Sequence, residues 1–135
     1  MAMKVLVVDD EAIVLKSCRA VLEAEGCEVF LAASVTEAWP VIDALSPELL
    51  LVDVKMPVHD GMYLMRRLRQ AGIGIPVVVM SGYSTAETVR EAEALGAVAF
   101  LSKPFTPDEL SHTVRSVRRT IKKEERHAQQ KSPGD

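Results

Sequence analysis

Cysteine is scarce in this sequence, and long apolar runs are absent from it. The two cysteines, Cys18 and Cys27, form no CxxC pair and no Cys/His cluster, which excludes a structural zinc site and argues against a disulfide framework. No apolar run approaches the ~20 residues that span a bilayer, and the N-terminus lacks the apolar core of a signal peptide. We therefore expect a cytoplasmic protein without membrane insertion, in which Cys18 is a small buried side chain.

Three motifs that bind phosphate or present a nucleophile are also missing. The sequence contains no GxxxxGKS/T, no GxGxxG after the first apolar run and no GxSxG. These absences exclude a Walker-type nucleotide loop, a dinucleotide fingerprint and the nucleophile elbow of hydrolases. The first apolar run ends instead in Asp9 and Asp10, where a flavin or nucleotide phosphate would require glycine.

The chain has 135 residues, the length of one domain, and its net charge of −3 is unevenly distributed. Residues 115–135 contain seven basic and three acidic residues, whereas residues 1–114 contain nine basic and sixteen acidic ones. The acidic body argues against a nucleic-acid-binding surface and suits a site that concentrates divalent cations. We interpret residues 1–121 as one domain and residues 122–135 as a charged extension or linker, which favours a solvated segment over a nucleic-acid-binding one.

Apolar runs alternate with amphipathic stretches along the chain. The apolar runs predict strands at 4–8, 27–32, 49–54, 75–80 and 98–101, and helical spacing predicts helices at 12–25, 34–45, 60–71, 84–95 and 106–126. Five such alternations indicate an α/β fold whose parallel sheet has helices on both faces. With right-handed crossovers, the expected architecture is a flavodoxin-like, doubly wound, five-stranded sheet of order 2-1-3-4-5.

Three helix starts carry a capping-box pattern, in which a Ser or Thr precedes a Glu by three residues. The pairs are Ser34 with Glu37, Ser84 with Glu87, and Thr106 with Glu109. Asp60 is expected to cap the helix that follows it. Pro40 conflicts with the helix at 34–45, because a proline in a helix interior costs about 3 kcal/mol or produces a kink. We therefore expect this helix to be short or bent near Trp39.

Polar side chains stand at the carboxyl ends of four predicted strands. The first strand ends in Asp9 and Asp10, the third in Asp53, the fourth in Ser81 and the fifth in Lys103. In the predicted topology these ends face one crevice beside the switch point of the sheet. Three carboxylates repel one another there unless protons or a hard cation neutralise them, and oxygen ligands with room for water suit Mg²⁺. The set fits phosphoryl transfer to a carboxylate, without identifying which Asp is the nucleophile.

Four motifs in this order resemble the receiver domain of bacterial two-component response regulators. They are VVDDE at residues 7–11, VDVKMPVHDG at 52–61, MSG at 80–82 and FLSKP at 100–104. Each motif is weak alone, but together they stand at the expected strand ends and make the resemblance specific. It extends from about residue 3 to about residue 120, nearly the whole domain.

The resemblance assigns roles to the residues of the crevice. Asp53 matches the phosphoacceptor, and Lys103 matches the lysine that pairs with the phosphoryl group. Asp9 and Asp10 match the acidic pair that holds Mg²⁺, Asp10 directly and Asp9 largely through water. Together with Asp53, the backbone carbonyl of Lys55 completes the implied metal ligands.

Two further positions match the switch residues of the family. Ser81 matches its Ser/Thr position, although a Ser-Gly pair before a helix is also ordinary turn chemistry. Phe100 matches its aromatic position, although composition alone would place this ring in the core. Lys55 and Tyr83 are expected near the site, either tuning phosphoryl lifetime through water access or simply lying at the surface.

The function implied by the resemblance is a phosphorylation-driven signalling switch. Asp53 would receive a phosphoryl group from a sensor histidine kinase or a phosphotransfer protein, with Mg²⁺ as cofactor. The surface of the fourth helix, fifth strand and fifth helix would then change for an output domain or effector protein, and phosphorylation could promote a homodimer. Nucleic acid would be bound only through a separate output domain. Such a domain assists its own phosphorylation and dephosphorylation, but it is not a turnover enzyme.

Two alternatives belong to other classes. A receiver-like binding module would work without phosphorylation, although the presence of all the acids and of Lys103 counts against it. A hydrolase with an aspartyl nucleophile would typically carry a D-x-D motif after the first strand and a cap insertion. This chain has Asp9-Asp10-Glu11 there and no spare length.

Overall fold

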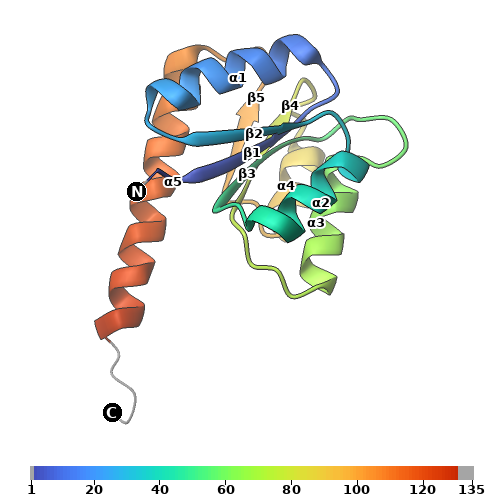
Figure 1. The fold of residues 1–135 in the computed structure, drawn as a ribbon. Helices are drawn as coiled ribbons and strands as arrows, with labels where there is room; N and C mark the ends of the chain where they lie inside the picture. The colour runs from blue at the N-terminus through green and yellow to red at the C-terminus, as the bar shows by residue number, and fades with distance from the viewer. Residues whose placement is uncertain (1, 131–135) are drawn as a thin grey trace.

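A computed structural model of the chain describes residues 2–130 and has five strands alternating with five helices (Figure 1). The strands are β1 (Lys4–Val8), β2 (Glu28–Ala32), β3 (Leu49–Asp53), β4 (Val77–Ser81) and β5 (Ala99–Ser102). The helices are α1 (Ala12–Ala24), α2 (Val35–Leu45), α3 (Gly61–Gln70), α4 (Ala86–Ala94) and α5 (Pro107–Gln130). The predicted succession of elements is confirmed, with small shifts at most of the boundaries.

The strands form one parallel sheet of order β2-β1-β3-β4-β5, as predicted from the alternation of elements. Because successive strand side chains point to opposite faces, each strand contributes to two cores. Val7 and Leu51 pack beneath α1 and α5, whereas Val8 and Val52 pack beneath α2, α3 and α4. The helices thus cover both faces of the sheet (Figure 1), and the carboxyl ends of all five strands meet at one edge.

Strand β4 begins later than the sequence predicts, and a proline explains the difference. The sequence predicts a strand from residue 75, but β4 begins at Val77. Pro76 has no N–H to pair with a neighbouring strand, and only its carbonyl takes part, accepting the N–H of Leu50 at 3.0 Å. The proline therefore delays the strand without breaking the sheet.

Two expectations about helices need correction. The helix that contains Pro40 is not short, because α2 continues through the proline to Leu45; the alternative expectation, a bend near Trp39, stays a prediction. The start of α4 is capped by Thr85, whose hydroxyl accepts the N–H of Thr88 at 3.2 Å, and not by Ser84. The Ser84 hydroxyl is hydrogen-bonded instead to the hydroxyl of Ser102, the last residue of β5, at 2.6 Å.

The other predicted caps are present. Ser34 accepts the N–H of Glu37 at 3.1 Å, and Asp60 accepts the N–H of Tyr63 at 2.8 Å. At the start of α5 the capping box is reciprocal, because Thr106 accepts from the N–H of Glu109 while the Glu109 carboxylate accepts from the N–H of Thr106. These caps fix the start of three helices, all of which begin at the carboxyl edge of the sheet.

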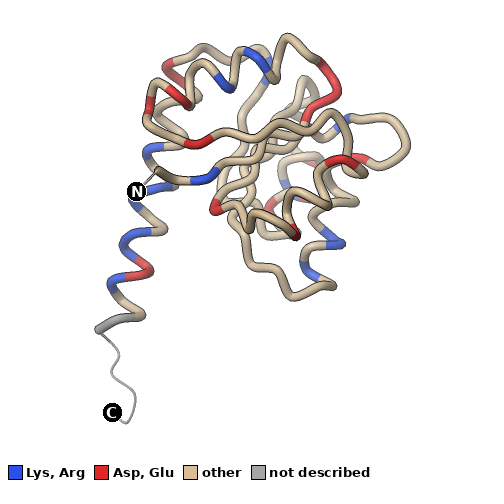
Figure 2. Tube along the Cα trace, in the orientation of Figure 1, with Lys and Arg blue, Asp and Glu red and all other residues tan. Residues whose placement is uncertain are grey.

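Helix α5 is longer than predicted. It continues four residues past the expected end at 126 and extends beyond the sheet (Figure 1). Its apolar side ends at the half-buried Ile121, and charged residues of both signs then follow along the exposed part (Figure 2). Of the extension predicted as frayed helix and coil, residues 122–130 are helical, and residues 131–135 lie outside the described part. Among residues 2–130, no helix has the length and apolar character to cross a membrane.

Candidate functional site

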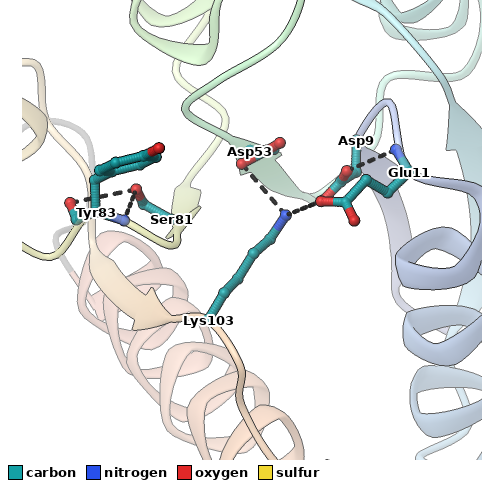
Figure 3. A network of polar contacts seen from close by, with 6 residues as sticks. All are labelled: Asp9, Glu11, Asp53, Ser81, Tyr83 and Lys103. Carbon is teal, nitrogen blue, oxygen red and sulfur yellow. Dashed lines mark hydrogen bonds and ion pairs between the residues drawn. The ribbon is translucent and has the colours of Figure 1, made fainter.

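The carboxyl edge of the sheet holds a cavity of about 500 Å³. Residues from the ends of β3, β4 and β5 line it, and the first turns of α1 form one wall. Asp53, Ser81 and Lys103, which the sequence assigns to one crevice, all line this cavity (Figure 3). The parallel topology also brings Lys103 to Asp9, which is 94 positions away in the sequence.

Lys103 is the centre of the polar network in the cavity. Its Nζ lies 2.6 Å from Oδ2 of Asp9, 3.4 Å from Oδ1 of Asp53 and 3.6 Å from Oε1 of Glu11 (Figure 3). The backbone N–H of Lys103 donates to the carbonyl of Ser81 at 2.7 Å, which ties the end of β5 to the end of β4. The ammonium group therefore lies between the carboxylates of β1 and β3.

Three carboxylates are clustered beside this ammonium group. Asp9, Asp10 and Asp53 each place a carboxylate oxygen within 4.8 Å of the other two. Asp9 is fully buried and Asp53 is 5% exposed, whereas Asp10 is exposed. Both oxygens of Asp9 are engaged by the protein, one with Lys103 and the other with the N–H of Glu11 at 2.9 Å. The cluster has the oxygen chemistry and the charge that a hard divalent cation requires.

Burial and charge repulsion shift the pKa of Asp53 upwards. The pKa of Asp53 is raised to about 6; removal from water is the main cause, the negative charge of Asp9 adds to it, and Lys103 opposes both. For Lys103, burial acts to lower the pKa, but the hydrogen bond to Asp9 and the charge of Asp53 outweigh burial and raise it. The site therefore has a protonated lysine facing an acid whose pKa is about 6.

Ser81 is in the cavity but does not face Asp53. This residue is 1% exposed, and its Oγ accepts the N–H of Tyr83 at 2.9 Å and donates to the Tyr83 carbonyl at 3.3 Å (Figure 3). Phe100, the other predicted switch residue, is half-buried on β5 and packs against the core beneath α2, α3 and α4. The structure thus places Ser81 with the predicted site and Phe100 outside the cavity.

The loop between β3 and α3 returns closely to the end of β3. A Cβ on Gly61 would lie 2.4 Å from the backbone oxygen of Asp53, so only glycine fits at this position. The Gly61 N–H donates to the carbonyl of Val54 at 3.0 Å and holds the loop against the strand. At the tip, Val58 is 92% exposed and has a φ of 69°, which is rare for a β-branched residue.

Three features of the cavity were not expected from the sequence. Glu11, quoted only as part of a motif, is an additional partner of Lys103. The Lys55 ammonium lies 3.8 Å from the centre of the Tyr83 ring, which joins two loops across the cavity wall. Cys18 is buried as predicted, but it also lines the cavity, and burial together with the charge of Asp9 raises its pKa to about 11. No local sequence pattern indicates these contacts, because each joins residues from separate elements.

Comparison with known proteins identifies the family. Residues 5–115 match the response regulator receiver domain. Sporulation initiation phosphotransferase F of Bacillus subtilis is 31% identical over 83% of this chain and 90% of its own length. The response regulator MprA of Mycobacterium bovis is 37% identical over 93% of this chain, but the chain spans only 54% of that protein.

Solved structures agree with the sequence relatives. A CheY-like receiver domain from Methanospirillum hungatei has a TM-score of 0.85 at 29% identity, covering 92% of this chain and 99% of the other. NtrX from Brucella abortus has a TM-score of 0.90 at 29% identity, covering 97% of this chain and 30% of the other. The chain therefore belongs to the receiver domains of response regulators in two-component systems, which are signalling switches and not classical enzymes.

Proposed function

We propose that this protein is a phosphoacceptor switch in which Asp53 receives a phosphoryl group from a sensor histidine kinase or a phosphotransfer protein. One observation carries the proposal: a buried carboxylate and a lysine line one cavity at the carboxyl edge of the sheet, and an acidic pair clusters with that carboxylate. The family match and the bacterial relatives support the same conclusion.

The donor set fits Mg²⁺. The Asp10 carboxylate is exposed, and no hydrogen bond or ion pair to it is present within residues 2–130, so it is available as a direct ligand. Asp53 and the backbone carbonyl of Lys55 would complete the protein ligands, and Asp9, already engaged on both oxygens, would act through water. Bound Mg²⁺ would supply positive charge to the oxygens of the incoming phosphoryl group.

The protein groups have distinct parts in the transfer. A carboxylate oxygen of Asp53 attacks phosphorus, the bond between phosphorus and the donor histidine nitrogen breaks, and its electron pair stays on the imidazole. Lys103, whose Nζ lies 3.4 Å from the Asp53 carboxylate, would neutralise charge on the transferred group. The raised pKa of Asp53 means that a nearby cation is needed to hold this residue fully ionised in mildly acidic solution.

Switching would follow from the new charge on Asp53. Ser81 would turn from Tyr83 towards a phosphoryl oxygen, and Phe100 would repack against the space that Ser81 leaves. The surface of α4, β5 and α5 would then change shape for an output domain or effector, as a population shift between two packings. In this proposal residues 1–121 form the cytoplasmic receiver and residues 122–135 a connecting extension, with dimerisation as one possible response.

Phosphorylation by a small donor tests the proposal directly. With acetyl phosphate and Mg²⁺, intact-mass analysis should detect one added phosphate that is stable to acid and labile to base and hydroxylamine. The adduct should disappear from Asp53→Asn and remain on Asp43→Asn, which changes an exposed carboxylate on α2. The same adduct on Asp53→Asn would overturn the assignment, and failure of Mg²⁺ to bind would favour a phosphorylation-independent binding module.

A further inference from the structure

A cation–π contact closes one side of the cavity. Lys55 lies in the loop after β3, two positions beyond Asp53, and Tyr83 lies in the loop after β4. The Lys55 ammonium is 3.8 Å from the centre of the Tyr83 ring, and both residues line the cavity. Both side chains are exposed, and Tyr83 is 57% exposed, so core packing does not force them together.

The same tyrosine fixes the orientation of Ser81. The Ser81 hydroxyl accepts the Tyr83 N–H and donates to the Tyr83 carbonyl, so both of its hydrogen bonds in this structure are made to one residue (Figure 3). Any movement of Ser81 towards Asp53 breaks both bonds and rearranges the turn that carries Tyr83. The position of the Tyr83 ring and the position of the Ser81 hydroxyl are therefore coupled through two residues of backbone.

We infer that the Lys55–Tyr83 contact is a latch that holds Ser81 away from Asp53 until negative charge is added there. The inference rests on the proposed function and makes Lys55 and Tyr83 positioning residues. Phosphorylation replaces the −1 charge of the Asp53 carboxylate with an acyl phosphate of about −2, so it adds about one negative charge only two positions from Lys55. A phosphoryl group attracts an ammonium more strongly than the face of an aromatic ring does. Lys55 would therefore leave the ring, and the released loop would let Ser81 turn inwards.

The latch has a defined effect on the binding of a phosphoryl mimic. Beryllofluoride with Mg²⁺ must overcome the contact in the native protein, so its apparent affinity is lowered by the energy of one exposed cation–π pair. Tyr83→Leu removes the ring and leaves Lys55 free to approach the mimic. We expect this variant to bind beryllofluoride about two- to fivefold more tightly. Tyr83→Phe keeps a ring face and should bind like the native protein.

A double-mutant cycle separates the latch from a general effect of Tyr83. In a Lys55→Gln background the ring has no cation to hold, so adding Tyr83→Leu should change beryllofluoride affinity by less than the single substitution does. The amide resonance of Ser81, followed by NMR without beryllofluoride, should move in Tyr83→Leu towards its position in the loaded native protein. Arg67→Gln breaks a comparable cation–π contact with Trp39, at 4.4 Å, and is the matched control with no expected change.

The outcomes distinguish this inference from the function on which it rests. If the native protein does not bind beryllofluoride with Mg²⁺, the phosphoacceptor proposal itself fails. If it binds but Tyr83→Leu has native affinity and a native Ser81 resonance, the latch is wrong and the phosphoacceptor proposal is untouched. An equal effect of Tyr83→Leu with and without Lys55 also overturns the latch, because the tyrosine would then act without the lysine.

Discussion

The amino edge and the carboxyl edge of the sheet are formed by opposite ends of the same five strands, but within residues 2–130 buried polar side chains are found only at the carboxyl edge. The three buried polar residues of the described chain, Asp9, Asp53 and Ser81, all belong to the carboxyl edge. At the amino edge the strand ends are closed by backbone pairing, as in the N–H of Glu48 that donates to the carbonyl of Lys4 at 2.8 Å. Helix α3 ends near that edge in a glycine turn, where Gly72 has a φ of 71°.

This difference separates stability from chemistry within one small domain. The amino edge and the central core bury apolar side chains and satisfied backbone groups, which favours folding. The carboxyl edge buries two acids and one lysine whose charges are balanced only in part, which opposes folding, and it is there that we propose a cation and a phosphoryl group bind. A substitution at the amino edge should therefore lower stability and leave phosphate acceptance intact. Removal of the buried acid at the carboxyl edge should raise stability and abolish phosphate acceptance.

The largest expected effect is at the amino edge. Leu49, the first residue of β3, is fully buried against the core beneath α1 and α5, so Leu49→Ala should lower the free energy of unfolding by about 2–5 kcal/mol. Urea unfolding followed by circular dichroism measures the loss. The folded variant should still accept phosphate from acetyl phosphate. A loss below about 1 kcal/mol would show that the strand end can collapse around the missing side chain.

At the carboxyl edge, removing the buried charge should stabilise the fold. The pKa of Asp53 is about 6 in the folded protein, against an ordinary value of 3.8. Below pH 4 the residue is protonated in both states, whereas above pH 6 the folded state is penalised by roughly 3 kcal/mol for its ionised form. Asp53→Asn should therefore be more stable than the native protein at pH 8, and this advantage should vanish as the pH falls from 6 to 4.

Urea unfolding in the presence of EDTA measures this pH dependence without a bound cation. Asp43→Asn is the matched control, because Asp43 is exposed and the substitution removes a charge from the surface of α2. An advantage for Asp53→Asn that persists unchanged at pH 4 would contradict the electrostatic explanation. It would indicate a packing effect of the amide and remove the distinction between the two edges.

Much of the fold was predictable because it depends on local pattern. The apolar runs and capping residues located all ten elements, and the parallel topology followed from their alternation. The full length of α5 was not predictable, because residues after Ile121 provide no apolar periodicity. The cap at Thr85 was missed because two adjacent hydroxyl residues compete there, and the hydrogen bond between Ser84 and Ser102 decides between them.

The sequence was enough to predict which residues meet in the site, but not how their side chains are oriented there. Strand ends and family motifs place Asp9, Asp53 and Lys103 together, and the structure brings them together. The sequence does not show that Lys103 is closer to Asp9 than to Asp53, or that Ser81 faces Tyr83. These details depend on side-chain rotamers and loop conformations, which long-range packing determines.

The cap of α5 tests whether the whole carboxyl edge lowers the stability of the fold or only its charged residues do. Thr106 lies two positions beyond the FLSKP motif, and its hydroxyl accepts the N–H of Glu109 at 3.1 Å. Thr106→Ala should lower the free energy of unfolding by about 1 kcal/mol, whereas Thr106→Ser should retain most of it. Urea unfolding at pH 5 and pH 8 should give the same loss, because no buried acid is involved. A loss that grows with pH would instead connect this cap to the charge cluster.

The smallest expected effect concerns the tip of the loop between β3 and α3. Val58 has a left-handed φ of 69° and is 92% exposed, so its β-branched side chain is strained and makes little compensating contact. Val58→Gly relieves the strain, worth about 1–2 kcal/mol, but adds freedom to the unfolded chain, worth about 0.5–1 kcal/mol. The net expectation is a gain of roughly 0.5–1 kcal/mol in urea unfolding.

Val58→Asn and Val58→Ala separate strain from other effects of the substitution at the loop tip. Asparagine tolerates the left-handed region and costs less unfolded-state entropy than glycine, so Val58→Asn should stabilise the fold about as much as Val58→Gly. Alanine keeps a Cβ in the same conformation, and Val58→Ala should recover only part of the gain. If all three variants are less stable than the native protein, Val58 makes a favourable contact that outweighs its strain. At the carboxyl edge, only the charge cluster would then lower the stability of the fold, and this loop would not.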